Sequence, residues 1–154
     1  MQFSYMLTVD CQLLTFGSDL QKESIELRYE ILRKPLGLHY TPEQLAAEAN
    51  QMHFAAICAN KVIGILLIEK LTDTACKMRQ VAVATEFQNK GIGKKLVQFA
   101  EHALQKMAIN SIILHARDTA IPFYLGLNYS IISDTFYEVG IPHKKMSKKI
   151  QLFS

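Results

Sequence analysis

The segment from residue 81 to residue 107 constrains the fold of this chain more than any other part of the sequence. An apolar run at 81–84 leads into a loop that contains Gly91 and Gly93, and an amphipathic helical pattern follows at 91–107. The first N–H groups of a helix have no partner within it, and they point outward with the positive end of the helix dipole. Because glycine has no Cβ, it lets a ligand approach the backbone closely. The segment therefore predicts a strand–loop–helix unit that can bind a phosphate group. Three lysines add positive charge near the loop: Lys90, Lys94 and Lys95.

Three phosphate-loop patterns can be compared with this segment. A P-loop fails, because Gln88 stands where its first glycine is needed and Lys95 stands where its hydroxyl residue is needed. A dinucleotide fingerprint fails, because Leu96 occupies the position of its third glycine. The pattern [Gln/Arg]-x-x-Gly-x-[Gly/Ala] is satisfied from Gln88 to Gly93. A plain strand-to-helix turn with two glycines remains the alternative at this point.

Hydrophobic periodicity along the rest of the chain indicates a mixed α/β domain. Strands are expected at 3–9 and 12–16, at 53–59 and 62–71 as a hairpin across Asn60-Lys61, and at 76–84, 111–115, 129–138 and 144–152. Helices are expected from Ser18 to just before Pro35, and at 41–50, 91–107 and 119–126. The order β-α-α-β-β-β-α-β-α-β-β predicts an α/β fold with a mixed sheet.

Composition excludes several classes of protein. A chain of 154 residues with 49% apolar residues fits one folded domain and argues against disorder. The three cysteines (Cys11, Cys58 and Cys76) form no CxxC pair and have no histidine at metal-ligand spacing, so we expect reduced thiols, a cytoplasmic location and no metal. The longest apolar run, Val62 to Ile68, is far short of the ~20 residues that span a bilayer, and the N-terminus lacks the features of a signal peptide.

A second group of motif residues lies about thirty residues after the glycine loop. The run 116–129 carries Phe123-Tyr124 ahead of Gly126 and Asn128, and the string Glu138-Val139-Gly140-Ile141-Pro142-His143 follows. Together with the loop, these segments resemble the GNAT superfamily of N-acetyltransferases. They are most similar to a subgroup of small bacterial GNAT proteins with a Glu-x-Gly-Ile-Pro-His hairpin near the C-terminus. The resemblance is close over 77–150 and loose over 1–70. Asn128 replaces a glycine of the family pattern where a left-handed conformation is expected, which asparagine tolerates.

The resemblance implies an acetyl-CoA-dependent N-acetyltransferase that moves an acetyl group to a primary amine of a small molecule or peptide by direct attack. It implies a GNAT-like, mostly antiparallel sheet flanked by helices in a single domain over 1–154. Residues 1–75 would form the acceptor side, and 76–154 the acetyl-CoA side with the C-terminal hairpin. The backbone of 81–83 would pair with the pantetheine, and the amides of 88–95 would hold the pyrophosphate. The implied cofactor-binding residues are Val81, Ala82, Val83, Gln88, Asn89, Lys90, Gly91, Ile92, Gly93, Lys94, Lys95 and Asp118.

Catalysis on this pattern needs a proton donor for the departing thiolate. The resemblance assigns this role to Tyr124, because a phenol with a pKa of ~10 holds its proton at neutral pH. The alternative for Tyr124 is core packing beside Phe123. The general base stays open among four residues near predicted strand ends: Glu69, His115, Glu138 and His143. Contacts to the acceptor are expected from Arg28, which could reach a substrate carboxylate, and from His143.

The net charge of +3 conceals an uneven distribution. Four of the 17 basic residues stand in the tail (Lys144, Lys145, Lys148 and Lys149), where we expect a solvated edge strand. Without them and the three loop lysines, 10 basic residues remain against 14 acidic ones. The rest of the chain is therefore acidic, and this favours a cationic acceptor over nucleic acid. A non-catalytic acyl-CoA-binding module on the same fold is the main alternative to an enzyme, and a homodimer is an expectation for a small domain of this class.

Overall fold

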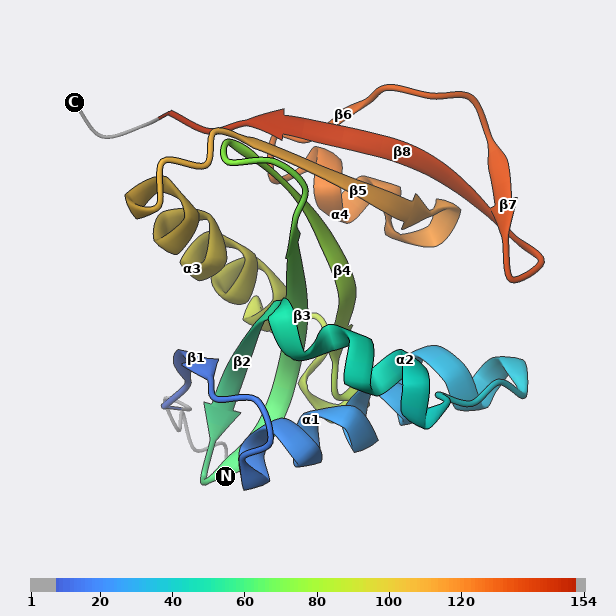
Figure 1. Cartoon of the computed structure of the whole chain (residues 1–154). Coiled ribbons are helices and arrows are strands. Elements are labelled where there is room, and N and C mark those ends of the chain that lie inside the picture. The colour runs from blue at the N-terminus through green and yellow to red at the C-terminus, as the bar shows by residue number, and fades with distance from the viewer. Residues whose placement is uncertain (1–7, 152–154) are drawn as a thin grey trace, which may run out of the picture. The chain divides into compact units, whose positions relative to one another are not determined.

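The computed structural model describes residues 8–151, and its strands form an eight-stranded sheet (Figure 1). The hydrogen-bonded order is β1-β2-β3-β4-β5-β8-β6, and β7 pairs with β8. The strands are β1 (Asp10–Leu14), β2 (Met52–Cys58), β3 (Lys61–Lys70), β4 (Ala75–Val83), β5 (Ser111–Arg117), β6 (Ser130–Ile131), β7 (Phe136–Glu138) and β8 (Ile141–Lys149). The pair β4–β5 is parallel, whereas β1–β2 and the three pairs that involve β8 are antiparallel. This confirms the predicted mixed, mostly antiparallel sheet.

Four α-helices accompany the sheet in the described residues. They are α1 (Asp19–Arg28), α2 (Pro42–Ala46), α3 (Ile92–Lys106) and α4 (Ile121–Leu125). The predicted helix starts are confirmed, because the Ser18 side chain accepts from the Gln21 N–H and Thr41 forms a capping box with Gln44. The α1 segment leaves α-helical geometry well before Pro35: a π-helical turn covers Tyr29–Arg33, and a 3₁₀ turn covers Lys34–Leu36. Pro35 is tolerated there because the first turn needs no N–H donor from it.

Several boundaries differ from the sequence prediction. The expected strand at 3–9 lies largely outside the described residues, and β1 instead overlaps the second candidate run at 12–16. The β2–β3 turn is formed by Ala59 and Asn60, both left-handed with φ of 49° and 63°, rather than by Asn60 and Lys61. Two left-handed residues suit the tight turn of a twisted hairpin. The run 129–138 forms the separate strands β6 and β7, so the chain ends with three strands instead of two.

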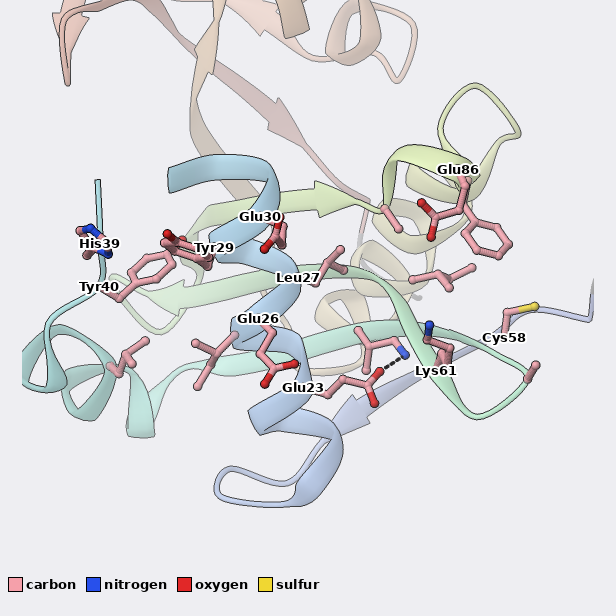
Figure 2. A pocket seen from close by; sticks show the side chains of 17 residues that line it. Glu23, Glu26, Leu27, Tyr29, Glu30, His39, Tyr40, Cys58, Lys61 and Glu86 are labelled. Carbon is pink, nitrogen blue, oxygen red and sulfur yellow. Dashed lines mark hydrogen bonds between the residues drawn. The ribbon is translucent and has the colours of Figure 1, made fainter. Parts of the chain in front are cut away.

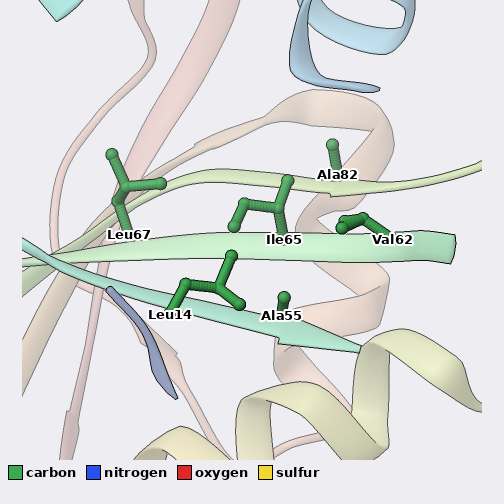
Figure 3. Close-up of a cluster of buried hydrophobic side chains, with 6 residues drawn as sticks. All are labelled: Leu14, Ala55, Val62, Ile65, Leu67 and Ala82. Carbon is green, nitrogen blue, oxygen red and sulfur yellow. The ribbon is translucent and has the colours of Figure 1, made fainter. Parts of the chain in front are cut away.

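The chain divides into two compact units that interleave along the sequence. One comprises the described residues up to Leu67 together with Gln80–Phe99, and the other comprises Ile68–Arg79 and the residues from Ala100 onward. The core of the first unit is a cluster of buried side chains from β1 to β4 (Figure 3): Leu14, Ala55, Val62, Ile65, Leu67 and Ala82. Leu20, Leu27 and Ile31 pack against it from the helical segment. Their helical spacing fixes which face of α1 turns toward the sheet.

The second unit is built around β5 and β8. Alternate residues of β5 are buried (Ile112, Leu114 and Ala116), as expected for a strand with one face in a core. Strand β8 pairs with β5 on one side and with β6 and β7 on the other, so its lysines do not form the expected edge strand. One of them, Lys148, donates to Glu101 at 3.0 Å, and Glu101 also accepts from the buried Tyr129 hydroxyl at 2.8 Å.

The structure adds two observations on residues 8–151. None of the helices formed by these residues has the length and apolar character needed to cross a membrane. Within the same range, no three His, Cys, Asp or Glu side chains are grouped so as to hold a metal ion.

A buried ion pair ties α1 to the helical segment after α2. The Arg28 guanidinium donates to both carboxylate oxygens of Glu48, at 2.9 Å and 2.8 Å. The two side chains are 0% and 6% exposed, so neither charge is solvated by bulk water. Each charge therefore depends on the other for compensation.

We predict that Glu48→Gln lowers the free energy of unfolding by about 3–5 kcal/mol, because it leaves the Arg28 charge buried without a counter-ion. Denaturant titration measures this change. The matched control is Glu30→Gln, whose partner Lys34 lies at 3.4 Å on the surface, and it should cost at most about 1 kcal/mol. Similar losses of unfolding free energy in the two variants would contradict the view that Arg28 and Glu48 depend on each other for charge compensation.

Candidate functional site: an anion-binding loop and an acidic cavity

The loop between β4 and α3 has a defined geometry in the first unit. A 3₁₀ turn covers Thr85–Phe87, and the Gln88 side-chain amide donates back to the Val83 carbonyl at 3.0 Å. Asn89 and Gly91 are left-handed, with φ of 60° and 79°. A Cβ built on Gly91 would meet no atom within 4 Å. The backbone at Gly91 is therefore open to a ligand on the side where another residue would carry its side chain.

Two of the eight amides that the resemblance implied for the pyrophosphate already have backbone partners. The Gln88 N–H bonds to the Thr85 carbonyl at 3.3 Å, and the Lys95 N–H bonds to the Gly91 carbonyl at 3.0 Å. The N–H groups of Ile92, Gly93 and Lys94 come before that first intrahelical bond and have no partner within α3. The positive end of the α3 dipole lies at the same three residues, so this position favours an anion.

The three loop lysines differ in their surroundings. Lys90 and Lys94 are exposed, and the Lys90 ammonium lies 5.8 Å from the centre of the Phe87 ring. The Lys95 ammonium donates to the Val9 carbonyl at 2.5 Å. Two of the three predicted charges are thus directed to solvent, whereas that of Lys95 contacts the backbone near β1.

The strand segment before the loop has one buried and two half-buried side chains. Ala82 is buried in the core cluster, while Val81 and Val83 are half-buried. Because side chains alternate along a strand, Ala82 points to the core face and its two neighbours point to the other face. Gln80, directly before this segment, has a left-handed φ of 56° inside β4. Its side chain accepts a hydrogen bond from the Tyr40 hydroxyl at 2.5 Å.

Tyr124 and Asp118 lie in the second unit. Tyr124 is buried on α4, with its ring centre 5.0 Å from that of Phe123 and 5.7 Å from that of Tyr129. Burial raises the pKa of Tyr124 above its usual value, because desolvation disfavours the phenolate. The hydroxyl therefore keeps its proton at neutral and mildly alkaline pH. Asp118 is exposed at the start of the 3₁₀ turn before α4.

Three of the four candidate general bases come together in the second unit. Nδ1 of His115 lies 2.5 Å from Oε1 of Glu138, and Nε2 of His143 lies 3.9 Å from Oε2 of the same carboxylate. Nδ1 of His143 lies 2.8 Å from the Ile141 carbonyl, which can only accept. This bond places the proton of a neutral His143 on Nδ1 and leaves Nε2 free to accept one. Glu69 is a half-buried residue of β3.

Arg28 does not face solvent as an exposed acceptor-binding residue would. Its side chain is fully buried, and both terminal nitrogens bond to Glu48. Its guanidinium also lies 4.6 Å from the centre of the Tyr40 ring. The sequence carried no local signal for this pairing, because Glu48 is twenty residues away on another helical segment.

A cavity of about 650 Å³ lies beside α1 in the first unit (Figure 2). Four carboxylate side chains line it: Glu23, Glu26, Glu30 and Glu86. Tyr29, His39 and Tyr40 line one end in the view, and Cys58, Lys61 and Glu86 line the other. Glu23 accepts from the Val62 N–H and Glu30 pairs with Lys34, whereas Glu26 and Glu86 have no hydrogen-bond or ion-pair partner among the described residues. This surface was not predicted from the sequence, although the spacing of Glu23, Glu26 and Glu30 on one helical face is a signal for it.

Comparison with known proteins identifies the family. The model of the acetyltransferase (GNAT) domain matches residues 19–150. The uncharacterized protein YyaT of Bacillus subtilis (strain 168) is 31% identical over 81 residues, which is 53% of this chain, and the chain spans 55% of its length. The uncharacterized N-acetyltransferase YjcF of the same organism is 25% identical over 82% of this chain and 91% of its own length.

Solved structures show the same fold. The crystal structure of a candidate N-acetyltransferase from Lactobacillus plantarum superposes with a TM-score of 0.83 at 17% identity, over 93% of this chain and 99% of that one. An aminoglycoside 6'-N-acetyltransferase complexed with coenzyme A gives 0.78 at 15% identity, over 94% and 99%. With a family model that covers most of the sequence and a matching fold, this chain belongs to the GNAT acetyltransferase-domain family.

Proposed function

We propose that the chain is an N-acetyltransferase that takes the acyl group from acetyl-CoA and transfers it to a primary amine of a small molecule or peptide. The observation that carries the proposal is the loop before α3, where unpartnered amides, an open Gly91 and two solvent-directed lysines meet at one helix start. This combination suits a pyrophosphate. Family membership supports the proposal, and so does the coenzyme A complex of a protein with the same fold.

The proposed chemistry is direct attack of the amine on the thioester carbon. Acetyl-CoA supplies an activated acyl group: a C–N bond forms, the C–S bond breaks, and the amine nitrogen loses a proton while the thiolate gains one. The Val81–Val83 backbone would pair with the pantetheine and donate an N–H to the carbonyl oxygen as charge develops there. The amides of Ile92 to Lys94 and the charges of Lys90 and Lys94 would hold the pyrophosphate.

Tyr124 is the proposed donor of the proton that the thiolate takes. Burial keeps its hydroxyl protonated, and among the described residues that hydroxyl has no hydrogen-bond partner that would hold its proton elsewhere. His143, with Nε2 free to accept a proton, is the proposed acceptor-side residue. A contact between Arg28 and the acceptor would require the guanidinium to leave Glu48, so we propose Arg28 as a support of the acceptor side rather than a ligand.

The proposed acceptor is cationic. In the cavity beside α1, four carboxylates face one lysine and one histidine. Like charges three and four residues apart on a helix repel each other, and a bound ammonium group would relieve that repulsion. We expect the protein to act in the cytoplasm and without nucleic acid, and a homodimer remains a prediction.

The cofactor loop is tested by Gly91→Ala against Gly37→Ala. Both glycines are left-handed and both have open space around a built Cβ, so each substitution should cost a similar backbone strain of about 1–2 kcal/mol. Only Gly91→Ala should weaken acetyl-CoA binding, by about tenfold or more, because a methyl group there obstructs charge-assisted bonds to phosphate. Titration calorimetry measures the affinity of each variant for acetyl-CoA. If the wild-type protein does not bind acetyl-CoA, the proposed function is wrong.

The proton donor is tested by Tyr124→Phe against Tyr137→Phe, which removes the same hydroxyl from a side chain that is 72% exposed. We expect kcat to fall about 10²–10⁴-fold for Tyr124→Phe with acetyl-CoA binding unchanged, and no change for Tyr137→Phe. Because burial raises the pKa of Tyr124, the wild-type kcat should not decline at pH 10, where a free phenol is half ionised. Acetyl-CoA binding without turnover of any amine would favour a non-catalytic acyl-CoA-binding module.

The charge preference for the acceptor is tested by Glu26→Gln and Glu86→Gln, with the exposed Glu43→Gln on α2 as the control. Each cavity variant should raise KM for a cationic amine about two- to fivefold, as expected for an exposed charge pair worth about 0.2–1 kcal/mol. The effect should shrink at high salt. A rise of the same size for Glu43→Gln would show that only the overall charge matters.

A further inference from the structure

Gln80 has a strained backbone directly before the proposed cofactor strand. It is left-handed at φ 56° although it lies within β4, and it is not a glycine. Left-handed geometry is unfavourable for an ordinary residue, and a single such residue in a strand bends the strand and re-aims the residues that follow. The direction of the Val81–Val83 backbone therefore depends on what holds Gln80 in this conformation.

The side chain of Gln80 is held by Tyr40. The Tyr40 hydroxyl donates to Oε1 of Gln80 at 2.5 Å, across forty residues of sequence. Tyr40 lies just before the Thr41 cap of α2, so the contact joins the segment between the first helices to the sheet.

The ring of Tyr40 is in turn held by two guanidinium groups. Arg28 lies 4.6 Å and Arg33 lies 4.7 Å from the ring centre, both within cation–π range. Arg28 is buried and fixed by its two bonds to Glu48. Packing thus sets the position of the Tyr40 hydroxyl before any ligand binds. Its contact with Gln80 is therefore preorganised.

We infer that Tyr40 is a positioning residue for acetyl-CoA: through its hydrogen bond to Gln80, it fixes the backbone that pairs with the pantetheine. This inference rests on the proposed function. It predicts that the hydroxyl matters for the acyl donor and not for the stability of the fold, because the ring and its two guanidinium contacts remain when the hydroxyl is removed.

The experiment compares Tyr40→Phe with Tyr29→Phe. Tyr29 lines the same cavity and stacks on His39 at 5.7 Å, but its hydroxyl has no hydrogen bond in the described structure. For Tyr40→Phe we expect the Kd for acetyl-CoA, titrated without an acceptor, to rise about three- to tenfold, as for one lost hydrogen bond. The thermal midpoint of the free protein should stay unchanged. Tyr29→Phe should leave both values at wild type.

A second variant changes the other partner of the Tyr40–Gln80 hydrogen bond. Gln80→Met keeps the length of the side chain and removes the acceptor, so it should raise the Kd by a similar factor even if Tyr40→Phe folds poorly. The double variant Tyr40→Phe/Gln80→Met should be no worse than either single variant, because both remove the same bond. Additive effects, or a wild-type Kd in both single variants, would overturn the inference and leave the proposed function standing. A wild-type protein that binds no acetyl-CoA would overturn both.

Discussion

The Arg28–Glu48 ion pair is the interaction on which the geometry of the first unit depends. Burying two charges costs several kcal/mol per ion, and only good geometry with further hydrogen bonds offsets it. Here the pair is bidentate, whereas Nε of Arg28 is buried without a hydrogen-bond partner among the described residues. One face of the guanidinium carries the Tyr40 ring. The pair therefore fixes three segments that share no sequence signal: the end of α1, the turn after α2, and the residues that lead into α2.

Charge of opposite sign is separated within this unit. The loop before α3 presents free amides and solvent-directed lysines, and the cavity beside α1 presents four carboxylates. A donor that carries phosphates and an acceptor that carries an ammonium group would each meet its complement and be repelled by the other surface. The tail lysines stand in the other unit, where β8 is paired on both sides and Lys148 forms an ion pair with Glu101.

The sequence predicted the features that depend on neighbouring residues. Local rules placed the caps at Ser18 and Thr41, the long helix α3, and a left-handed Asn128, which is observed at φ 71°. The contacts of Arg28 and Tyr40 were beyond such rules, because their partners stand twenty and forty residues away. His115, Glu138 and His143 were named one by one, but their convergence follows from the antiparallel β5–β8 register, which pairs Arg117 with His143, and from the β7–β8 hairpin.

The left-handed residues show why Gln80 differs from every other strained position in the described structure. Ala59, Asn60, Val139 and Gly140 form hairpin turns, and Ala108 and Asn128 follow helices. Asn89 and Gly91 belong to the loop before α3, and Gly17 and Gly37 stand beside α1 and the turns that follow it. Each of these residues ends or reverses an element, where such geometry is ordinary.

Among residues 8–151, Gln80 alone is left-handed inside a strand, and a distant tyrosine holds its side chain. Strain of this kind persists only where the surrounding structure imposes it, and it tends to gather at functional sites. The left-handed Gln80 therefore belongs with the loop that follows it: in the proposed function, Gln80 would aim the strand at the pantetheine and the loop would receive the phosphates.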